Sequence, residues 1–172
     1  CYFFRLGQSV GIEGIAEMAG FFGISDEDGP IPGMSQPGFI GTPAYKQQQG
    51  LGAWALTDTA NVSIGQGLLK VSPLQMAGVT AAIANGGTIW RPRLILNQEA
   101  QKPEPGSLMV DLVKQGVKPE DLNRVRRGMW QVVNATGGTG RNAQSPIGIA
   151  GKSGTAQHQR HNDARMVVDD FT

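Results

Sequence analysis

The residues best suited to chemistry in this chain lie in one run near the C-terminus, residues 149–157, which reads Ile-Ala-Gly-Lys-Ser-Gly-Thr-Ala-Gln. The run is predicted to form a β-strand. Gly154 has no Cβ, so a ligand can lie flat against the backbone at that point. Lys152 adds a positive charge beside it, and Ser153 and Thr155 add hydroxyl groups and a backbone N–H. Such a strand can bind an acyl substrate through the substrate's carboxylate and carbonyl oxygen.

The triplet Gly151-Lys152-Ser153 also ends the phosphate-binding loop of nucleotide-binding proteins, G-x-x-x-x-G-K-[ST]. That loop requires a glycine where this chain has Pro146, and the polar residues after Ser153 open no apolar helix. A nucleotide-binding domain is therefore kept only as a minor alternative.

The composition indicates a folded domain without a charge-driven partner. The 172 residues suffice for one domain with a core. Hydrophobic residues make up 40% and charged residues 17%, which excludes charge-driven disorder. A formal net charge of +1 argues against a nucleic-acid binder that relies on phosphate contacts. The 25 glycines and 10 prolines indicate many turns.

Residue types that would support metal binding or membrane insertion are sparse. Cys1 is the single cysteine, so neither an intrachain disulfide nor a cysteine-rich zinc site is expected. His158 and His161 lie in a polar stretch that is predicted to be a turn, and we expect no metal site and no cofactor there. The sequence has no apolar run of about 18 residues, as a membrane span requires, and no signal peptide.

Two short helices separated by Gly11 are predicted at the N-terminus, over residues 1–10 and 12–22. In the second helix, apolar residues recur at spacings of four and three, which indicates a core-facing stripe of Ile15, Ala19 and Phe22. Gly23 fits the C-cap of that helix.

Two long segments rich in Pro, Gly and polar residues are predicted to be irregular, residues 25–60 and 97–118. The polar run 46–49 within the first of them is expected to be solvated surface, with a partner-facing loop as the alternative.

A helix is predicted from Pro73 to Asn85, because Ser72 is a good N-cap, Pro suits the first helical position and two glycines follow. Its face is rich in small residues and is expected to be buried: Ala77, Gly78, Ala81, Ala82 and Ala84. Residues 88–96 should then be extended, with exposed arginines.

The clearest predicted helix starts at Pro119, with acidic residues in its first turn, where negative charge suits the helix dipole. Its predicted core stripe is Leu122, Val125, Met129 and Val132. Arg124, Arg126 and Arg127 lie off this stripe and are expected to be solvated. The glycine cluster at residues 136–140 is either a simple helix stop or a loop that approaches a ligand.

The end of the chain is predicted to be an antiparallel hairpin, in which residues 149–157 and a strand from Met166 flank a polar turn at 158–165. Because the sequence begins and stops inside apolar patterns, we expect it to be truncated at both ends.

Four groups of residues, taken in order, resemble the transpeptidase domain of class B penicillin-binding proteins. Tyr2-Phe3-Phe4 resembles the start of the helix that follows the family's Ser-x-Asn motif. The remaining matches are residues 62–67 with 72–77 (the Gly-Gln-Gly segment and adjoining helix), 84–87 with Pro92 (Ala-Asn-Gly-Gly and the following Pro), and 151–156 (the Lys-Thr/Ser-Gly-Thr-Ala strand). Trp54, Asp58 and Thr59 further resemble the elongation-type members, which build the side wall of rod-shaped bacteria.

The resemblance implies an α+β fold of the penicillin-binding protein and β-lactamase type, an antiparallel sheet with helices on both faces, of which residues 1–172 would form a partial transpeptidase domain. It implies a peptidoglycan D,D-transpeptidase that cross-links stem peptides ending in D-Ala–D-Ala through a serine acyl-enzyme and is inhibited by β-lactams. Lys152 and the Thr155 N–H, as an oxyanion donor, would be catalytic, and Ser153, Gly154 and Thr155 would bind substrate.

The resemblance also implies partners and a location. We expect a glycosyltransferase and cell-wall elongation proteins as partners, and a parent anchored in the cytoplasmic membrane with its catalytic domain on the outer side.

The sequence departs from the family because no serine is followed three residues later by lysine, as the family's nucleophile motif Ser-x-x-Lys requires. The family's Ser-x-Asn motif and the last strand or strands of its sheet are also expected to be missing. The Ser-x-Asn motif would lie just before Cys1. These 172 residues alone are therefore expected to be inactive.

A non-catalytic β-lactam sensor or scaffold of the same fold is an alternative. A serine β-lactamase is disfavoured by the Gly-Gln-Gly segment and by the length of the 25–60 segment.

Overall fold

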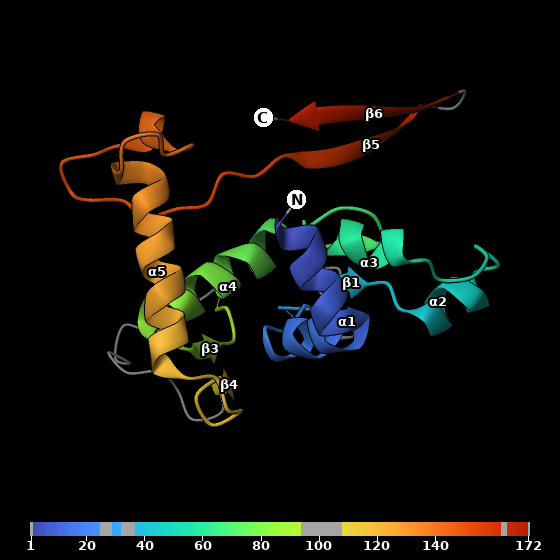
Figure 1. Cartoon of the computed structure of the whole chain (residues 1–172), viewed down its shortest axis with the longest axis horizontal. Helices are drawn as coiled ribbons and strands as arrows, with labels where there is room; N and C mark the ends of the chain where they lie inside the picture. The colour runs from blue at the N-terminus through green and yellow to red at the C-terminus, as the bar shows by residue number, and fades with distance from the viewer. Residues whose placement is uncertain (1, 25–28, 32–36, 94–107, 163–164, 172) are drawn as a thin grey trace. The chain divides into compact units, whose positions relative to one another are not determined.

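The computed structural model describes residues 2–24, 29–31, 37–93, 108–162 and 165–171 (Figure 1). Two compact units are present, Cys1–Pro119 and Glu120–Thr172. In chain order the elements are α1 (Tyr2–Phe21), β1 (Phe39–Ile40), α2 (Pro43–Gln48), α3 (Leu56–Val62), β2 (Leu69–Lys70), α4 (Pro73–Asn85), β3 (Thr88–Trp90), β4 (Leu108–Asp111), α5 (Pro119–Asn134), the 3₁₀ helix η1 (Arg141–Ala143), β5 (Ala156–Asn162) and β6 (Arg165–Phe171). No helix within these ranges combines the length and the apolar character that a membrane crossing requires.

Helix α1 contains the predicted break at Gly11, where φ is 80° and ψ is 160°. Only glycine adopts such a backbone conformation readily, and the kink divides the helix into the two expected pieces. Gly23, at φ 73°, follows the helix, and the Ile24 N–H donates to the Ala19 carbonyl at 3.0 Å. The predicted C-terminal signal is therefore confirmed.

The core of the first unit forms where α1, α3 and the first pair of strands meet. Ile12, Ala19, Ile40 and Val62 are buried there, and Ile15, Trp54 and Leu69 are among the side chains packed against them. The predicted stripe on α1 is thus confirmed for Ile15 and Ala19.

Helices α1 and α3 approach closely at Gly7. A Cβ at this position would lie 2.2 Å from the Ser63 Cβ, so only glycine fits without displacement. The Ser63 hydroxyl lies 2.7 Å from the Ala60 carbonyl and 3.2 Å from the Phe3 carbonyl, to which it donates. The residue that ends α3 therefore also holds the first turn of α1.

The prediction that residues 25–60 are irregular is wrong for β1, α2 and α3; residues 25–28 and 32–36 lie outside the described residues. The Thr42 hydroxyl accepts a hydrogen bond from the Tyr45 N–H at 3.2 Å, and Pro43 is the first residue of α2. The proline starts a helix here instead of breaking one. Strand β1 pairs antiparallel with β2, Phe39 opposite Lys70.

Helix α4 has the predicted bounds, and its capping box is complete. The Ser72 hydroxyl accepts from the Gln75 N–H, and the Gln75 side chain accepts from the Ser72 N–H. Gly86 follows the helix at φ 89°. The Gln75 amide also donates to the carbonyls of Gly23 and Ile24, which ties α4 to the end of α1.

The expected burial of the small-residue face of α4 is wrong for Ala77, Ala81 and Ala84, which are exposed. Ala82 is fully buried, and β3 packs against α4.

Strand β3 pairs antiparallel with β4, with Ile89 opposite Val110. The prediction that residues 97–118 form a loop and linker is therefore wrong for residues 108–111 and confirmed for the turn and irregular residues 112–118, while residues 94–107 lie outside the described residues. Arg91 and Arg93 are exposed as predicted. Leu112 follows β4 and is fully buried, with its N–H donating to the Gly87 carbonyl at 2.8 Å.

The second unit consists of α5, η1 and the hairpin of β5 and β6. Leu122 and Val133 are buried on α5, whereas Val125 is 48% exposed, so the predicted core stripe is wrong at that position. Arg124 is exposed as expected and pairs with Asp121 at 2.6 Å. The strands are antiparallel as predicted, with Ala156 opposite Phe171. The predicted turn at 158–165 is wrong, because residues 158–162 and Arg165 belong to the strands.

Replacing Gly7 with alanine is expected to destabilise the fold by about 1–3 kcal/mol, because the added methyl group overpacks the contact with Ser63. Gly20→Ala on the same helix is the matched control: a Cβ there has no neighbour within 4 Å, and alanine's higher helix propensity should stabilise by up to about 1 kcal/mol. Urea denaturation followed by circular dichroism measures both changes. Equal effects of the two substitutions would contradict the close packing of α1 on α3.

Candidate functional site

The four residues singled out from the sequence, Lys152, Ser153, Gly154 and Thr155, lie together on an exposed segment between η1 and β5. The prediction that a strand spans residues 149–157 is wrong for most of this run, because β5 begins at Ala156. Ala156 pairs with Phe171, the last residue of β6.

Helix α5 holds the start of this segment by two hydrogen bonds. The Gly151 N–H donates to the Met129 carbonyl at 3.0 Å, and the Asn134 amide donates to the Ile149 carbonyl at 2.8 Å. The same Asn134 amide donates to the Trp130 carbonyl, which fixes its orientation at the helix end. Lys152 therefore follows directly after a stretch of backbone that is anchored on a helix.

The positive charge of Lys152 lies over Ser153. Its Nζ is 2.5 Å from the Ser153 carbonyl oxygen and 3.5 Å from the Ser153 hydroxyl. A Cβ added to Gly154 would have no neighbour within 4 Å, so the space over this residue is open. An exposed ammonium beside hydroxyl groups and an open stretch of backbone suits an anionic ligand, such as a carboxylate.

Sequence reasoning missed two residues that contact this segment. Asn134 was not singled out, and Thr139 was seen only as part of the glycine cluster. The Thr139 and Ser153 hydroxyl oxygens lie 2.9 Å apart. The cluster is thus both the end of α5 and a loop that reaches the predicted site residues.

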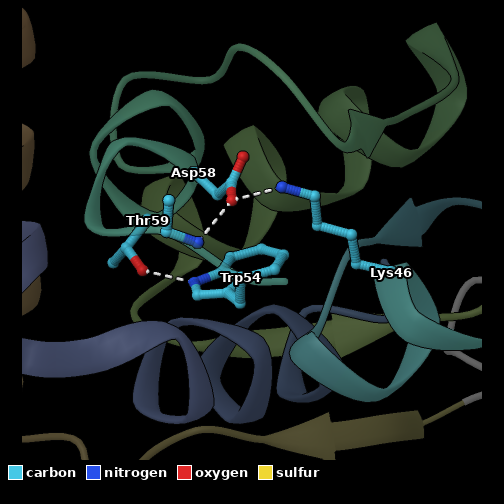
Figure 2. Close-up of polar contacts among 5 residues, drawn as sticks. Lys46, Trp54, Asp58 and Thr59 are labelled. Atoms are coloured by element: carbon cyan, nitrogen blue, oxygen red, sulfur yellow. Dashed lines mark hydrogen bonds and ion pairs between the residues drawn. The ribbon is translucent and has the colours of Figure 1, made fainter. Parts of the chain in front are cut away.

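A second polar cluster lies in the first unit, between α2 and α3 (Figure 2). Lys46 Nζ pairs with Asp58 Oδ2 at 2.7 Å, and the same carboxylate oxygen accepts from the Ala55 N–H at 2.7 Å. Trp54 Nε1 donates to the buried Thr59 hydroxyl at 2.9 Å. Lys46, expected as solvated surface, is instead part of the contact that joins the two helices.

The contacts of Asp58 favour its charged form. The hydrogen bond from Lys46, together with the one from the Ala55 N–H, holds the pKa of Asp58 below the ordinary value for an aspartate. The carboxylate is therefore charged at neutral pH, where it holds the start of α3.

An open pocket of about 570 Å³ lies beside this cluster, lined by Pro43, Gln47, Gly50, Gly52, Ala53 and Trp54. None of these side chains carries a charge or a nucleophile. The groups suited to acyl chemistry remain those of residues 152–155.

Comparison with known proteins identifies relatives along almost the whole chain. The sequence profile of one family, described as the penicillin binding protein transpeptidase domain, matches residues 1–169. Peptidoglycan D,D-transpeptidase MrdA of Haemophilus influenzae is 34% identical over 161 residues, which cover 91% of this chain and 24% of the relative. MrdA of Salmonella typhimurium strain SL1344 is 32% identical over 162 residues, which cover 91% and 26%. The chain thus spans about a quarter of the length of these relatives.

Solved structures are similar in fold as well as in sequence. Pseudomonas aeruginosa PBP2, in complex with WCK 5153, has a TM-score of 0.76 and 33% identity over 91% of this chain and 36% of that one. The complex between PBP2 and MreC from Helicobacter pylori has a TM-score of 0.77 and 28% identity, over 91% and 28% of the respective chains. These likenesses confirm the fold class predicted from the sequence.

Replacing Asp58 with asparagine is expected to lower the free energy of unfolding at pH 7 by about 1 kcal/mol, because the ion pair with Lys46 is lost while an acceptor for the Ala55 N–H remains. Since folding lowers the pKa of Asp58, its charge contributes stability above the unfolded pKa of about 4, and this contribution is lost as the pH falls through the folded pKa. The difference between the two proteins should therefore shrink below pH 4, as measured by urea denaturation across pH.

Asp121→Asn is the matched control for this measurement, because it breaks an ion pair whose side chains are 52% and 80% exposed. Such a pair contributes little to stability, so this variant should differ little from the unsubstituted protein at either pH. If Asp58→Asn lowered the free energy of unfolding by the same amount at pH 7 and at pH 3, the stabilising role of the Asp58 charge would be contradicted.

Proposed function

The chain belongs to the penicillin-binding protein transpeptidase family, and from this premise we propose that it is part of a peptidoglycan D,D-transpeptidase. The proposed substrates are stem peptides that end in D-Ala–D-Ala, and β-lactams are the proposed inhibitors. The observation that carries the proposal is the exposed Lys152–Thr155 segment, in which an ammonium and hydroxyl groups border the open backbone at Gly154.

The proposed reaction is acyl transfer in two steps. A serine hydroxyl loses its proton to a base and attacks the carbonyl carbon of the penultimate D-Ala, the C–N bond breaks, and protonated D-Ala leaves. An amine from a neighbouring stem peptide then attacks the resulting ester, and the serine regains its proton as the C–O bond breaks. The chain would contribute to both steps by holding the substrate and stabilising the oxyanion.

Each residue of the segment has a proposed role in that binding. Lys152 and the hydroxyls of Ser153 and Thr155 would bind the terminal carboxylate of the stem peptide. The Thr155 N–H would be one of two oxyanion donors, the other being the N–H of the nucleophilic serine. Loss of one such donor typically lowers the rate by about 10²–10³. Gly154 would let the substrate backbone lie against the segment.

We place the nucleophile outside these 172 residues, because none of their serines precedes a lysine by three positions. The 172 residues alone should therefore bind no penicillin covalently.

The proposed setting is that of the elongation-type members. Trp54, Asp58 and Thr59, which form the cluster between α2 and α3, support this subgroup (Figure 2). We propose a glycosyltransferase and cell-wall elongation proteins as partners. The likeness of this chain to Helicobacter pylori PBP2 in its complex with MreC supports a protein partner of this kind, but it does not bear on the glycosyltransferase. The proposed location is the cytoplasmic membrane, with the transpeptidase domain on its outer side.

Labelling of the full-length protein with fluorescent penicillin, followed by mass mapping of the labelled peptide, tests this function. The expected adduct is on a serine that precedes residue 1 of this sequence. An adduct within the 172 residues would overturn the position of the nucleophile. Absence of any adduct would overturn the proposed transpeptidase activity and favour a non-catalytic scaffold of the same fold.

Lys152→Ala in the full-length protein is expected to lower the rate of acylation by penicillin at least about tenfold, because an ammonium that binds the carboxylate is lost. Lys114→Ala is the matched control: this side chain is 77% exposed, pairs only with Asp111 at 3.7 Å among the described residues and should leave the rate unchanged. Time courses of labelling measure both rates. Equal rates for the two variants would remove Lys152 from the site.

A further inference from the structure

Thr139 lies in the loop after α5, and the backbone of this loop leaves it little freedom. The Gly138 N–H donates to the Ala135 carbonyl at 3.0 Å, and the Gly140 N–H donates to the Val132 carbonyl at 2.9 Å. A Cβ at Gly138 would lie 2.3 Å from the Val132 carbonyl oxygen, so the chain can fold back this tightly only with glycine there. Thr139, between the two glycines, is thereby held against the end of the helix.

The partner of Thr139 is held by the same helix. Residues 149 and 151 are bonded to Asn134 and to the Met129 carbonyl, and Ser153 follows two residues later. The 2.9 Å contact between the Thr139 and Ser153 hydroxyls therefore joins two segments that both have α5 as their support. The backbone on each side holds its hydroxyl group in place, so the contact does not depend on a long, flexible side chain.

Either hydroxyl of this pair can be the donor, and the two directions differ in what they leave of Ser153 for a ligand. A hydroxyl group has one donor and two acceptor positions, whereas a lysine ammonium can only donate. Lys152 Nζ, at 3.5 Å, therefore occupies one acceptor position of the Ser153 oxygen. If Thr139 donates to the second acceptor position, the Ser153 hydrogen remains available. If Thr139 accepts instead, that hydrogen is consumed.

A carboxylate can only accept hydrogen bonds, so it requires the first arrangement. We propose that Thr139 is a positioning residue, whose hydroxyl donates to Ser153 and so turns the Ser153 hydrogen toward the carboxylate of the substrate. The chain of donors runs from Thr139 to Ser153 to the carboxylate, and each bond in such a chain polarises the next. This inference rests on the proposed transpeptidase function and adds to it a basis for selecting anionic substrates.

Loss of the Thr139 hydroxyl should affect recognition of the carboxylate without affecting stability. Thr139 and Ser153 are both exposed, and an exposed pair of hydroxyls exchanges readily for water. Thr139→Val, which keeps the shape and removes the hydroxyl, should therefore leave the thermal denaturation midpoint unchanged. The same substitution should reduce the selectivity for a carboxylate over a neutral group.

The experiment compares acylation of the full-length protein by benzylpenicillin and by its neutral methyl ester. Thr139→Val should lower the rate ratio of acid to ester by about three- to tenfold, the usual effect of one hydrogen bond between neutral groups. Thr139→Ser, which restores the hydroxyl, should recover most of the ratio. Thr136→Val, in the same loop, is the matched control, because the exposed Thr136 makes no side-chain hydrogen bond within the described residues and should leave the ratio unchanged.

Three results would overturn the inference while leaving the proposed function standing. These are an unchanged ratio in Thr139→Val, an equal loss of rate for the acid and the ester, and a Thr139→Ser variant as impaired as Thr139→Val. Absence of acylation in the unsubstituted protein would instead overturn the proposed function, and the role of Thr139 with it.

Discussion

The candidate site depends on one structural constraint, the attachment of residues 149–151 to helix α5. The Gly151 N–H bonds to the Met129 carbonyl, and the Asn134 amide bonds to the Ile149 carbonyl. Lys152 to Thr155 lie between this attachment and the first paired residue of β5, Ala156. A segment held at both ends can present an ammonium, hydroxyl groups and open backbone without belonging to a strand, because the conformational entropy of its ends is already lost.

The same helix explains why a loop rich in glycine lies beside charged and hydroxyl-bearing residues. Gly138 and Gly140 allow the chain to fold back on the last turn of α5, and this brings the Thr139 hydroxyl to Ser153. Glycine has a structural role at these positions, whereas a Cβ at Gly154 would have no neighbour within 4 Å. The two uses look alike in a sequence and differ only in what surrounds the Cα atom.

The first unit uses polar contacts of another kind. Asp58 serves two functions at once, because its carboxylate pairs with Lys46 on α2 and accepts from the backbone at the start of α3. Helix α3 in turn ends at Ser63, which contacts α1 through Phe3 and Gly7. Three helices are thus connected through Lys46, Asp58 and Ser63, and the buried apolar residues Ile12 and Ala19 of α1 pack with Val62 of α3.

The sequence by itself determined the features that depend on neighbouring residues: the caps of α4 at Ser72 and Gly86, the break at Gly11, the start of α5 and the antiparallel hairpin. These follow from local backbone preferences and hydrogen bonds within a few residues. The order of the motifs also sufficed to identify the family and the fold class. Tertiary structure decided the rest, because it depends on partners distant in sequence. Strand β4 exists through pairing with β3, Lys46 is bound through Asp58, and residues 149–151 are held by contacts with α5.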